Sequence, residues 1–223
     1  VLRDQGRFRG KVAESYHVIF DIYIGKMKNM FRAADTKRAL LCYNIIMFHN
    51  KKPSLVRTEA PMEILFYRYN NICEPDLIQT FTDFGITVCT EETEMTDKHV
   101  SPQQCALRLT QWLTEHSFAF VFSINFFPAI SYTCNRFKVP YVCWSVDSPV
   151  PELFSNALKN EWNRIFLFDH AQYQSFHPVN PGRIFYLPLA ANVKRWERAV
   201  LGMTEKDFAG YGGDVSFVGS LYT

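Results

Sequence analysis

The sequence predicts an α/β protein with a doubly wound, mostly parallel, Rossmann-like sheet and an N-terminal helical arm. Two short runs, residues 118–124 and 139–146, are rich in β-forming residues and apolar on both faces. Central strands covered by helices on either side have this pattern. Apolar strand-like runs also alternate with helix-like segments along the chain, as expected for parallel strands joined by crossovers.

The remaining elements follow from periodicity and from turn residues. The predicted strands cover residues 38–48, 86–89, 118–124, 139–146, 164–168 and 183–187. Pro61 begins a predicted helix with Met62, Leu65, Phe66 and Tyr69 on one face. Further helices are expected at 126–137, from Pro149 onward, and between a cap at Asp169 and Phe176.

One helix has a strong start signal near residue 101. Ser101 stands at the cap position, Pro102 at the first helical position and Gln104 three residues after the cap. This is the capping-box pattern, and Val100 can pack onto Cys105 across it. The acidic residues shortly before this helix are expected to form a solvated loop: Glu91, Glu92, Glu94 and Asp97.

The chain divides into three predicted regions. Residues 1–36 form the arm, in which apolar groups in 12–31 recur at helical spacing, with a strand at 17–24 as the alternative. Residues 37–192 form the Rossmann-like domain. Residues 193–223 are charged, then glycine-rich, then apolar, which predicts a linker and the first strand of a truncated second domain.

Composition excludes several classes of protein. A net charge of +2 with no run of Lys or Arg argues against nucleic-acid binding. The six cysteines show no CxxC pair and no zinc-finger spacing, which predicts reduced thiols in a cytoplasmic protein. No signal peptide opens the chain, and no apolar stretch approaches the ~20 residues needed to span a bilayer.

Several catalytic motifs are missing from the sequence. There is no GxGxxG after a strand, no P-loop, no GxSxG and no HExxH. The DxD pair with which many glycosyltransferases hold a metal-bound nucleotide is also absent. We therefore predict neither a cofactor nor a bound metal.

Polar residues at the strand ends are the candidate site, because ligands bind at the carboxyl edge of open α/β sheets. Asp147 either caps the helix predicted at Pro149 or orients a substrate hydroxyl as an ionised, weakly basic carboxylate. Asn125 is either a helix cap or a ligand to substrate, and Trp144 either stacks on a sugar or packs in the core. The remaining candidates for substrate binding are Ser123, Ser148, His49 and His170.

A set of motifs in a fixed order resembles a known family. These are SINFFP (123–128), VPYVCWSVDSP (139–149), IFLFD (165–169), YLPLAAN (186–192) and DVSFVGSLY (214–222). They are similar to motifs of bacterial CgeB-like, spore-maturation-type glycosyltransferase proteins, whose N-terminal half is a domain of unknown function. The resemblance covers roughly residues 38–222 and implies the N-terminal half of a two-domain GT-B architecture.

The resemblance implies an acceptor-binding domain of a metal-independent glycosyltransferase. The donor, a nucleotide-sugar, would bind to a C-terminal domain that this chain lacks, and a sugar or glycosylated acceptor would bind here. Asp147 would orient the acceptor hydroxyl, and the chain alone would be inactive. The alternatives are a non-catalytic glycan- or protein-binding module and, more weakly, a response-regulator-like domain, which would require an acidic cluster where Phe48, His49 and Asn50 stand.

Overall fold

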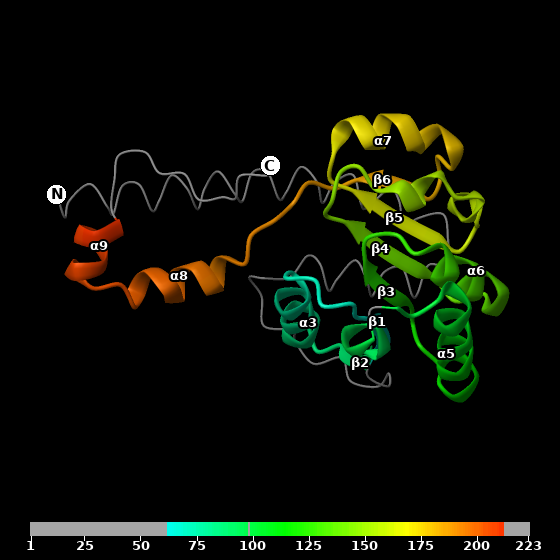
Figure 1. Cartoon of the computed structure of the whole chain (residues 1–223), viewed down its shortest axis with the longest axis horizontal. Coiled ribbons are helices and arrows are strands. Elements are labelled where there is room, and N and C mark those ends of the chain that lie inside the picture. Colours follow the sequence, from blue (N-terminus) through cyan, green and yellow to red (C-terminus); the bar gives the residue numbers. More distant parts are fainter. Residues whose placement is uncertain (1–61, 98, 212–223) are drawn as a thin grey trace, which may run out of the picture. The chain divides into compact units, whose positions relative to one another are not determined.

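The computed structural model describes residues 62–97 and 99–211 of the chain (Figure 1). The chain forms two compact units, of which the first ends at Pro188 and the second begins at Leu189. The first unit contains the sheet and the candidate site.

The described residues of the first unit form a sheet of six parallel strands in the order β2-β1-β3-β4-β5-β6. The strands are β1 (Glu63–Tyr67), β2 (Thr87–Glu91), β3 (Val121–Ile124), β4 (Tyr141–Ser145), β5 (Asn163–Leu167) and β6 (Ile184–Tyr186). The two apolar runs from which the fold was predicted become the neighbouring central strands β3 and β4, with Val121 opposite Tyr141. The predicted parallel α/β fold is confirmed.

Helices and turns connect these strands. They are α3 (Glu74–Asp83), α4 (Thr93–Thr96), α5 (Pro102–Glu115), α6 (Pro128–Phe137), α7 (His170–Phe176) and the 3₁₀ turns η1 (Pro151–Phe154), η2 (Asn156–Lys159) and η3 (His177–Val179). The capping box at the start of α5 is confirmed. Ser101 Oγ accepts from the Gln104 amide at 3.2 Å, and Gln104 Oε1 accepts from the Ser101 amide at 2.8 Å.

Alternation along each strand sends side chains to two separate cores. In β4, Tyr141 and Cys143 pack with residues of α5, α6 and α7 on one face. Val142 and Trp144 pack on the other face, where α3 contributes Leu77, Ile78 and Phe81. Helices therefore cover both faces of the sheet, with α5 and α6 side by side in Figure 1.

The helix predicted from Pro61 is wrong: the described part of this segment is strand β1. The apolar residues fit helical spacing, but Ile64, Leu65, Phe66 and Tyr67 are all buried. A helix on a sheet buries one face only, whereas a central strand buries both. Helix α3, which was not predicted, begins after Cys73 with Pro75 in its first turn.

Two further predictions are corrected. Short 3₁₀ turns replace the helix expected from Pro149, and the first of them starts after Val150 without a side-chain cap. The expected acidic loop contains the end of β2 and the short helix α4, with Glu91 only 3% exposed.

The predicted linker from residue 193 onward contains two helices in its described part, α8 (Val193–Leu201) and α9 (Glu205–Tyr211).

The second unit consists of these two helices in its described part. Asn192 caps α8 by accepting from the Arg195 amide at 3.0 Å, and Trp196 and Leu201 are exposed on it. The predicted helix at 12–31, the strand at 38–48, His49 and the strand at 214–222 all lie outside the described residues. Within residues 62–97 and 99–211, no helix has the length and apolar character needed to cross a membrane.

Candidate functional site

The strand order of the sheet has one reversal point among the described strands, and such a point is where ligands bind in open α/β sheets. Going along the described sheet, the chain order reverses between β1 and β3. The loops that leave these two strands run in opposite directions along the sheet, so a crevice opens between them at the carboxyl edge. A ligand site in such a fold is expected at this point.

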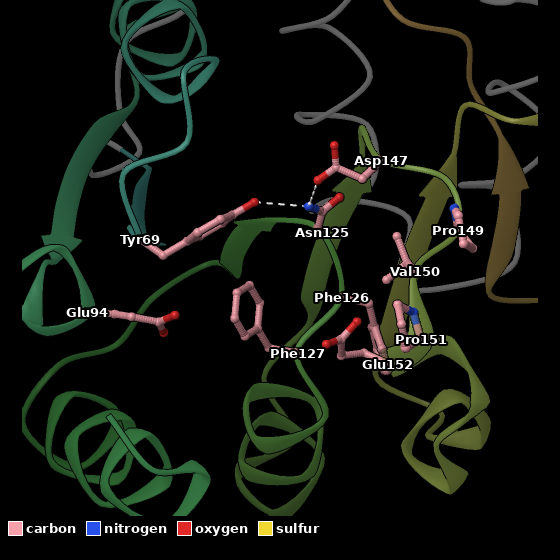
Figure 2. Close-up of a pocket in the computed structure, with 10 residues that line it drawn as sticks. All are labelled: Tyr69, Glu94, Asn125, Phe126, Phe127, Asp147, Pro149, Val150, Pro151 and Glu152. Atoms are coloured by element: carbon pink, nitrogen blue, oxygen red, sulfur yellow. Dashed lines mark hydrogen bonds between the residues drawn. The ribbon is translucent and has the colours of Figure 1, made fainter. Parts of the chain in front are cut away.

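A pocket of about 320 Å³ lies at this reversal, within the size range of small-molecule sites. Its walls come from loops that follow four strands, and Figure 2 shows their side chains. The lining residues are Tyr69, Glu94, Asn125, Phe126, Phe127, Asp147, Pro149, Val150, Pro151 and Glu152.

Asn125, Asp147 and Tyr69 form a hydrogen-bonded network at the mouth of this pocket. Asn125 Nδ2 donates to Asp147 Oδ2 at 2.5 Å and to the Tyr69 hydroxyl at 3.0 Å (Figure 2). Asn125 Oδ1 accepts from the Val146 amide at 3.0 Å. This pocket network ties together the loops that follow β1, β3 and β4.

A buried carboxylate fixes the loop that carries Tyr69. Glu74, only 1% exposed, accepts from the amides of Tyr69 and Asn71 at 2.8 and 3.0 Å, and from Arg68 Nε at 3.1 Å. Burial and the charge of Asp147 raise the pKa of Tyr69 to about 12, although hydrogen bonds from Asn71 and Asn125 act in the opposite direction. Tyr69 is therefore a neutral hydroxyl at physiological pH.

The lining is acidic and aromatic. Glu94, Asp147 and Glu152 contribute carboxylates, and the described lining residues include no Lys, Arg or His. Glu94 accepts from the Tyr67 hydroxyl. The Phe127 ring lies between Glu94 and Glu152 in the view of Figure 2, with its centroid 5.3 Å from that of Tyr69. Such a surface attracts hydroxyl and amine donors and repels anions.

Hydrogen bonds from α7 hold the loop between Asp147 and Val150. Gln172 Nε2 donates to the Asp147 carbonyl at 3.1 Å, and Gln172 Oε1 accepts from the Val150 amide at 3.3 Å. Ser148 donates to Asp169 Oδ2 at 2.9 Å. Bonds from the Gln172 amide and from Ser148 lower the pKa of Asp169, which caps α7 as predicted.

Of the predicted site residues that the structure describes, only Asp147 and Asn125 line the pocket. Neither is a helix cap: α6 starts after Phe127 without a side-chain cap, and η1 starts after Val150 in the same way. The backbone of Asn125 has φ = 57°, in the left-handed region that Asn tolerates better than most residues.

The other predicted residues are engaged elsewhere. Ser123 is fully buried, where its hydroxyl donates to the Asn125 carbonyl at 2.7 Å and lies 2.6 Å from that of Tyr141. Trp144 packs in the α3-side core and donates to the Leu187 carbonyl at 3.3 Å. Ser148 bonds Asp169, and His170 stacks edge-on against Tyr186 with centroids 5.2 Å apart.

Sequence reasoning missed Tyr69, Phe127, Glu94 and Glu152 as lining residues. Tyr69 was assigned to a helix, although its place two residues after a short apolar run is a usable signal once 63–67 is taken as a strand. Glu94 was assigned to a solvated loop. In the described part of the chain, no three His, Cys, Asp or Glu side chains lie close enough together to hold a metal ion.

Comparisons with protein-family models, with curated proteins and with solved structures find no match to this chain. The fold and the pocket therefore define its class by themselves. It is a parallel α/β protein with a Rossmann-like sheet and an acidic, aromatic pocket at the carboxyl edge.

Proposed function

We propose that the pocket binds a hydroxyl-rich acceptor, and that the chain is the acceptor-side domain of a GT-B-type glycosyltransferase. The observation that carries the proposal is the composition of the lining at the strand reversal: three carboxylates, an amide, a tyrosine hydroxyl and aromatic rings. Carboxylate and amide oxygens accept from sugar hydroxyls, and aromatic faces pack against the C–H faces of a sugar ring.

The same lining supports an acceptor rather than a donor site. A nucleotide-sugar carries a diphosphate, which protein sites bind with Arg, Lys or helix N-termini. Glu94, Asp147 and Glu152 would repel the diphosphate, and none of the lining residues in the described part of the chain carries a positive charge to offset them. Recognition of the donor phosphates would therefore belong to a partner domain of the complete enzyme.

Asp147 would orient the acceptor hydroxyl. Its side chain is exposed at the pocket mouth, with one carboxylate oxygen held by Asn125. Among the described residues, no hydrogen bond is found to the second oxygen, Oδ1. A carboxylate fixed through one oxygen can accept from an acceptor hydroxyl with the other and hold its oxygen for attack on the donor sugar.

Ligand-observed NMR with three probes tests the proposal: methyl α-D-glucopyranoside, glucosamine and glucose 6-phosphate. We expect saturation transfer to the first two and none to the phosphate. Asp147→Ala should weaken binding by about tenfold or more, because a hydrogen bond to a charged group is lost. Glu161→Ala removes an equally exposed carboxylate just before β5, away from the pocket lining, and should leave binding unchanged.

Three outcomes would count against this assignment. Preferential binding of glucose 6-phosphate would contradict the acceptor site. In a full-length enzyme, Asp147→Ala should abolish turnover of a nucleotide-sugar, whereas retained turnover would refute the role of Asp147. A glycoside that binds to a full-length protein without any turnover would indicate the non-catalytic glycan-binding module instead.

A further inference from the structure

Asn125, in the loop after β3, hydrogen-bonds to residues of the loops after both β1 and β4. It follows β3, the strand that lies between β1 and β4 in the sheet. Its own amide donates to the Trp144 carbonyl at 3.0 Å, which continues the β3–β4 ladder by one residue. The left-handed backbone at Asn125 ends the strand and turns the chain toward α6.

The hydrogen-bonding capacity of the Asn125 side chain is almost fully used. Its two Nδ2 hydrogens are donated to Asp147 and Tyr69, and its oxygen accepts from the Val146 amide. The orientation of the amide is fixed chemically, because a backbone N–H can only donate and a carboxylate can only accept. No donor of Asn125 remains for a ligand.

We infer that Asn125 is a positioning residue rather than a ligand contact. It fixes the Asp147 carboxylate and the Tyr69 hydroxyl relative to each other across the mouth of the pocket. The inference deepens the proposed function and rests on it, since the carboxylate thus held is the one proposed to orient the acceptor.

The chemistry of the position explains why an asparagine stands there. The left-handed backbone favours Gly, Asn or Asp. Gly has no side chain to offer, and Asp would accept from Val146 but could donate nothing to Asp147. Asn is the residue that combines this backbone with one acceptor and two donors.

NMR of the unliganded protein tests the geometry. The two side-chain amide protons of Asn125 should give separate, hydrogen-bonded resonances. Asp147→Ala should shift one of them and Tyr69→Phe the other, since each removes one acceptor. Lys138→Ala is the matched control, because Lys138 also has a left-handed backbone, at the end of α6, and should move neither. Two resonances at free-amide positions that respond to neither variant would overturn the inference.

An exchange of the two side chains tests the role. Asn125→Asp alone keeps an acceptor for Val146 but faces Asp147 with a second carboxylate, and should lower the folding equilibrium constant about tenfold. Combining Asn125→Asp with Asp147→Asn restores an N–H···O bond between the two positions with its direction reversed. The double variant should therefore recover most of the lost stability.

Binding of methyl α-D-glucopyranoside separates positioning from a purely structural role. It should be lost in Asn125→Asp and stay lost in the double variant, whose carboxylate has moved from position 147 to position 125. If Asn125→Asp binds the glycoside as the native chain does, the positioning role is refuted while the proposed function stands. If the amide signature appears but no probe binds the native chain, the proposed function fails while the geometry of Asn125 stands.

Discussion

Two asparagine-centred networks lie in the first unit and differ mainly in burial. The pocket network consists of Tyr69, Asn125 and Asp147. The second, here called the core network, consists of Ser131, Asn160 and Asn163. Asn163 and Ser131 are fully buried, whereas Asp147 is exposed.

The partners of the two networks differ accordingly. Asn163 Oδ1 accepts from Ser131 at 2.7 Å, and its Nδ2 donates to the Ala157 carbonyl at 2.8 Å. Both of these partners of the Asn163 side chain are protein groups, and the two bonds join η2 and α6 to the start of β5. The pocket network includes the Asp147 carboxylate, which can still accept a hydrogen bond from a ligand. Buried polar groups must satisfy one another, while exposed ones can exchange a water for a ligand.

The largest effect is expected in the core network. Asn163→Leu removes the bonds that Asn163 makes to Ser131 and to the Ala157 and Leu158 carbonyls in a buried site, where Ser131 and the Ala157 carbonyl keep only their mutual bond of 3.1 Å and the bond from Asn160. We expect the free energy of unfolding to fall by about 3 kcal/mol. Urea unfolding followed by circular dichroism measures it. A loss below about 1 kcal/mol would mean that the core network is not structural.

The next largest loss of stability is expected for a change at Glu91. This carboxylate lies at the same sheet edge as Asp147, but it is buried whereas Asp147 is exposed. Burial alone would raise its pKa. Bonds from Thr93 and from Trp112 Nε1 at 2.6 Å, with the charge of Arg108, outweigh burial, so that the pKa lies below its ordinary value of 4.5. Glu91→Gln should lower the free energy of unfolding at pH 7 by about 2 kcal/mol.

The sign of the pKa shift fixes the pH dependence of this effect. The unfolded chain binds a proton to Glu91 more readily than the folded chain does, so acid favours unfolding. The native advantage over Glu91→Gln should be complete above pH 4.5 and disappear as the pH falls through the folded pKa. Urea unfolding of both proteins from pH 7 downward measures it. A constant difference in the free energy of unfolding between the native chain and Glu91→Gln at all pH values would contradict the pKa shift.

The sequence predicted the fold better than the site, for a physical reason. Strands β3 and β4 and the Ser101 capping box depend on local pattern, and all three are confirmed. Strand β1 was missed because a buried run of five residues satisfies helical and strand spacing equally. The short length of this apolar run favoured a strand over a helix. Because the strand was not predicted, Tyr69 was not selected as a residue at a strand end.

The geometry of the site depends on which strands are neighbours. Asp147 and Asn125 could be selected as strand-end polar residues, but their contact requires β3 and β4 to pair in the observed register. Ser123 was selected by the same rule, yet its side chain points into the core toward Tyr141. Alternation along the strand decided this, and a shift of one residue would have turned Ser123 toward the α3-side core instead.

Tyr141→Phe is expected to have an intermediate effect, because this hydroxyl connects the buried core to the pocket network. It is fully buried, accepts from the Phe127 amide at 3.0 Å and lies 2.6 Å from the Ser123 hydroxyl. We expect the free energy of unfolding to fall by about 1–2 kcal/mol. Chemical denaturation measures the stability, and amide hydrogen exchange at Phe127 should become faster. Unchanged exchange would mean that the hydroxyl does not support the loop beneath the pocket.

The smallest effect on stability is expected for Asp147→Ala, which is the sharpest test of the difference between the networks. Water can take the place of the exposed carboxylate at Asn125 Nδ2, so the free energy of unfolding should change by less than about 0.5 kcal/mol. Glu161→Ala, which removes an exposed carboxylate just before β5, should change it equally little. If Asp147→Ala alone lowered the free energy of unfolding by about 2 kcal/mol, an effect approaching that expected for Asn163→Leu, the pocket network would stabilise the fold as the core network does. A negligible loss accompanied by failure to bind the glycoside would instead mean that this side chain is retained for its ligand, because nothing in the fold depends on it.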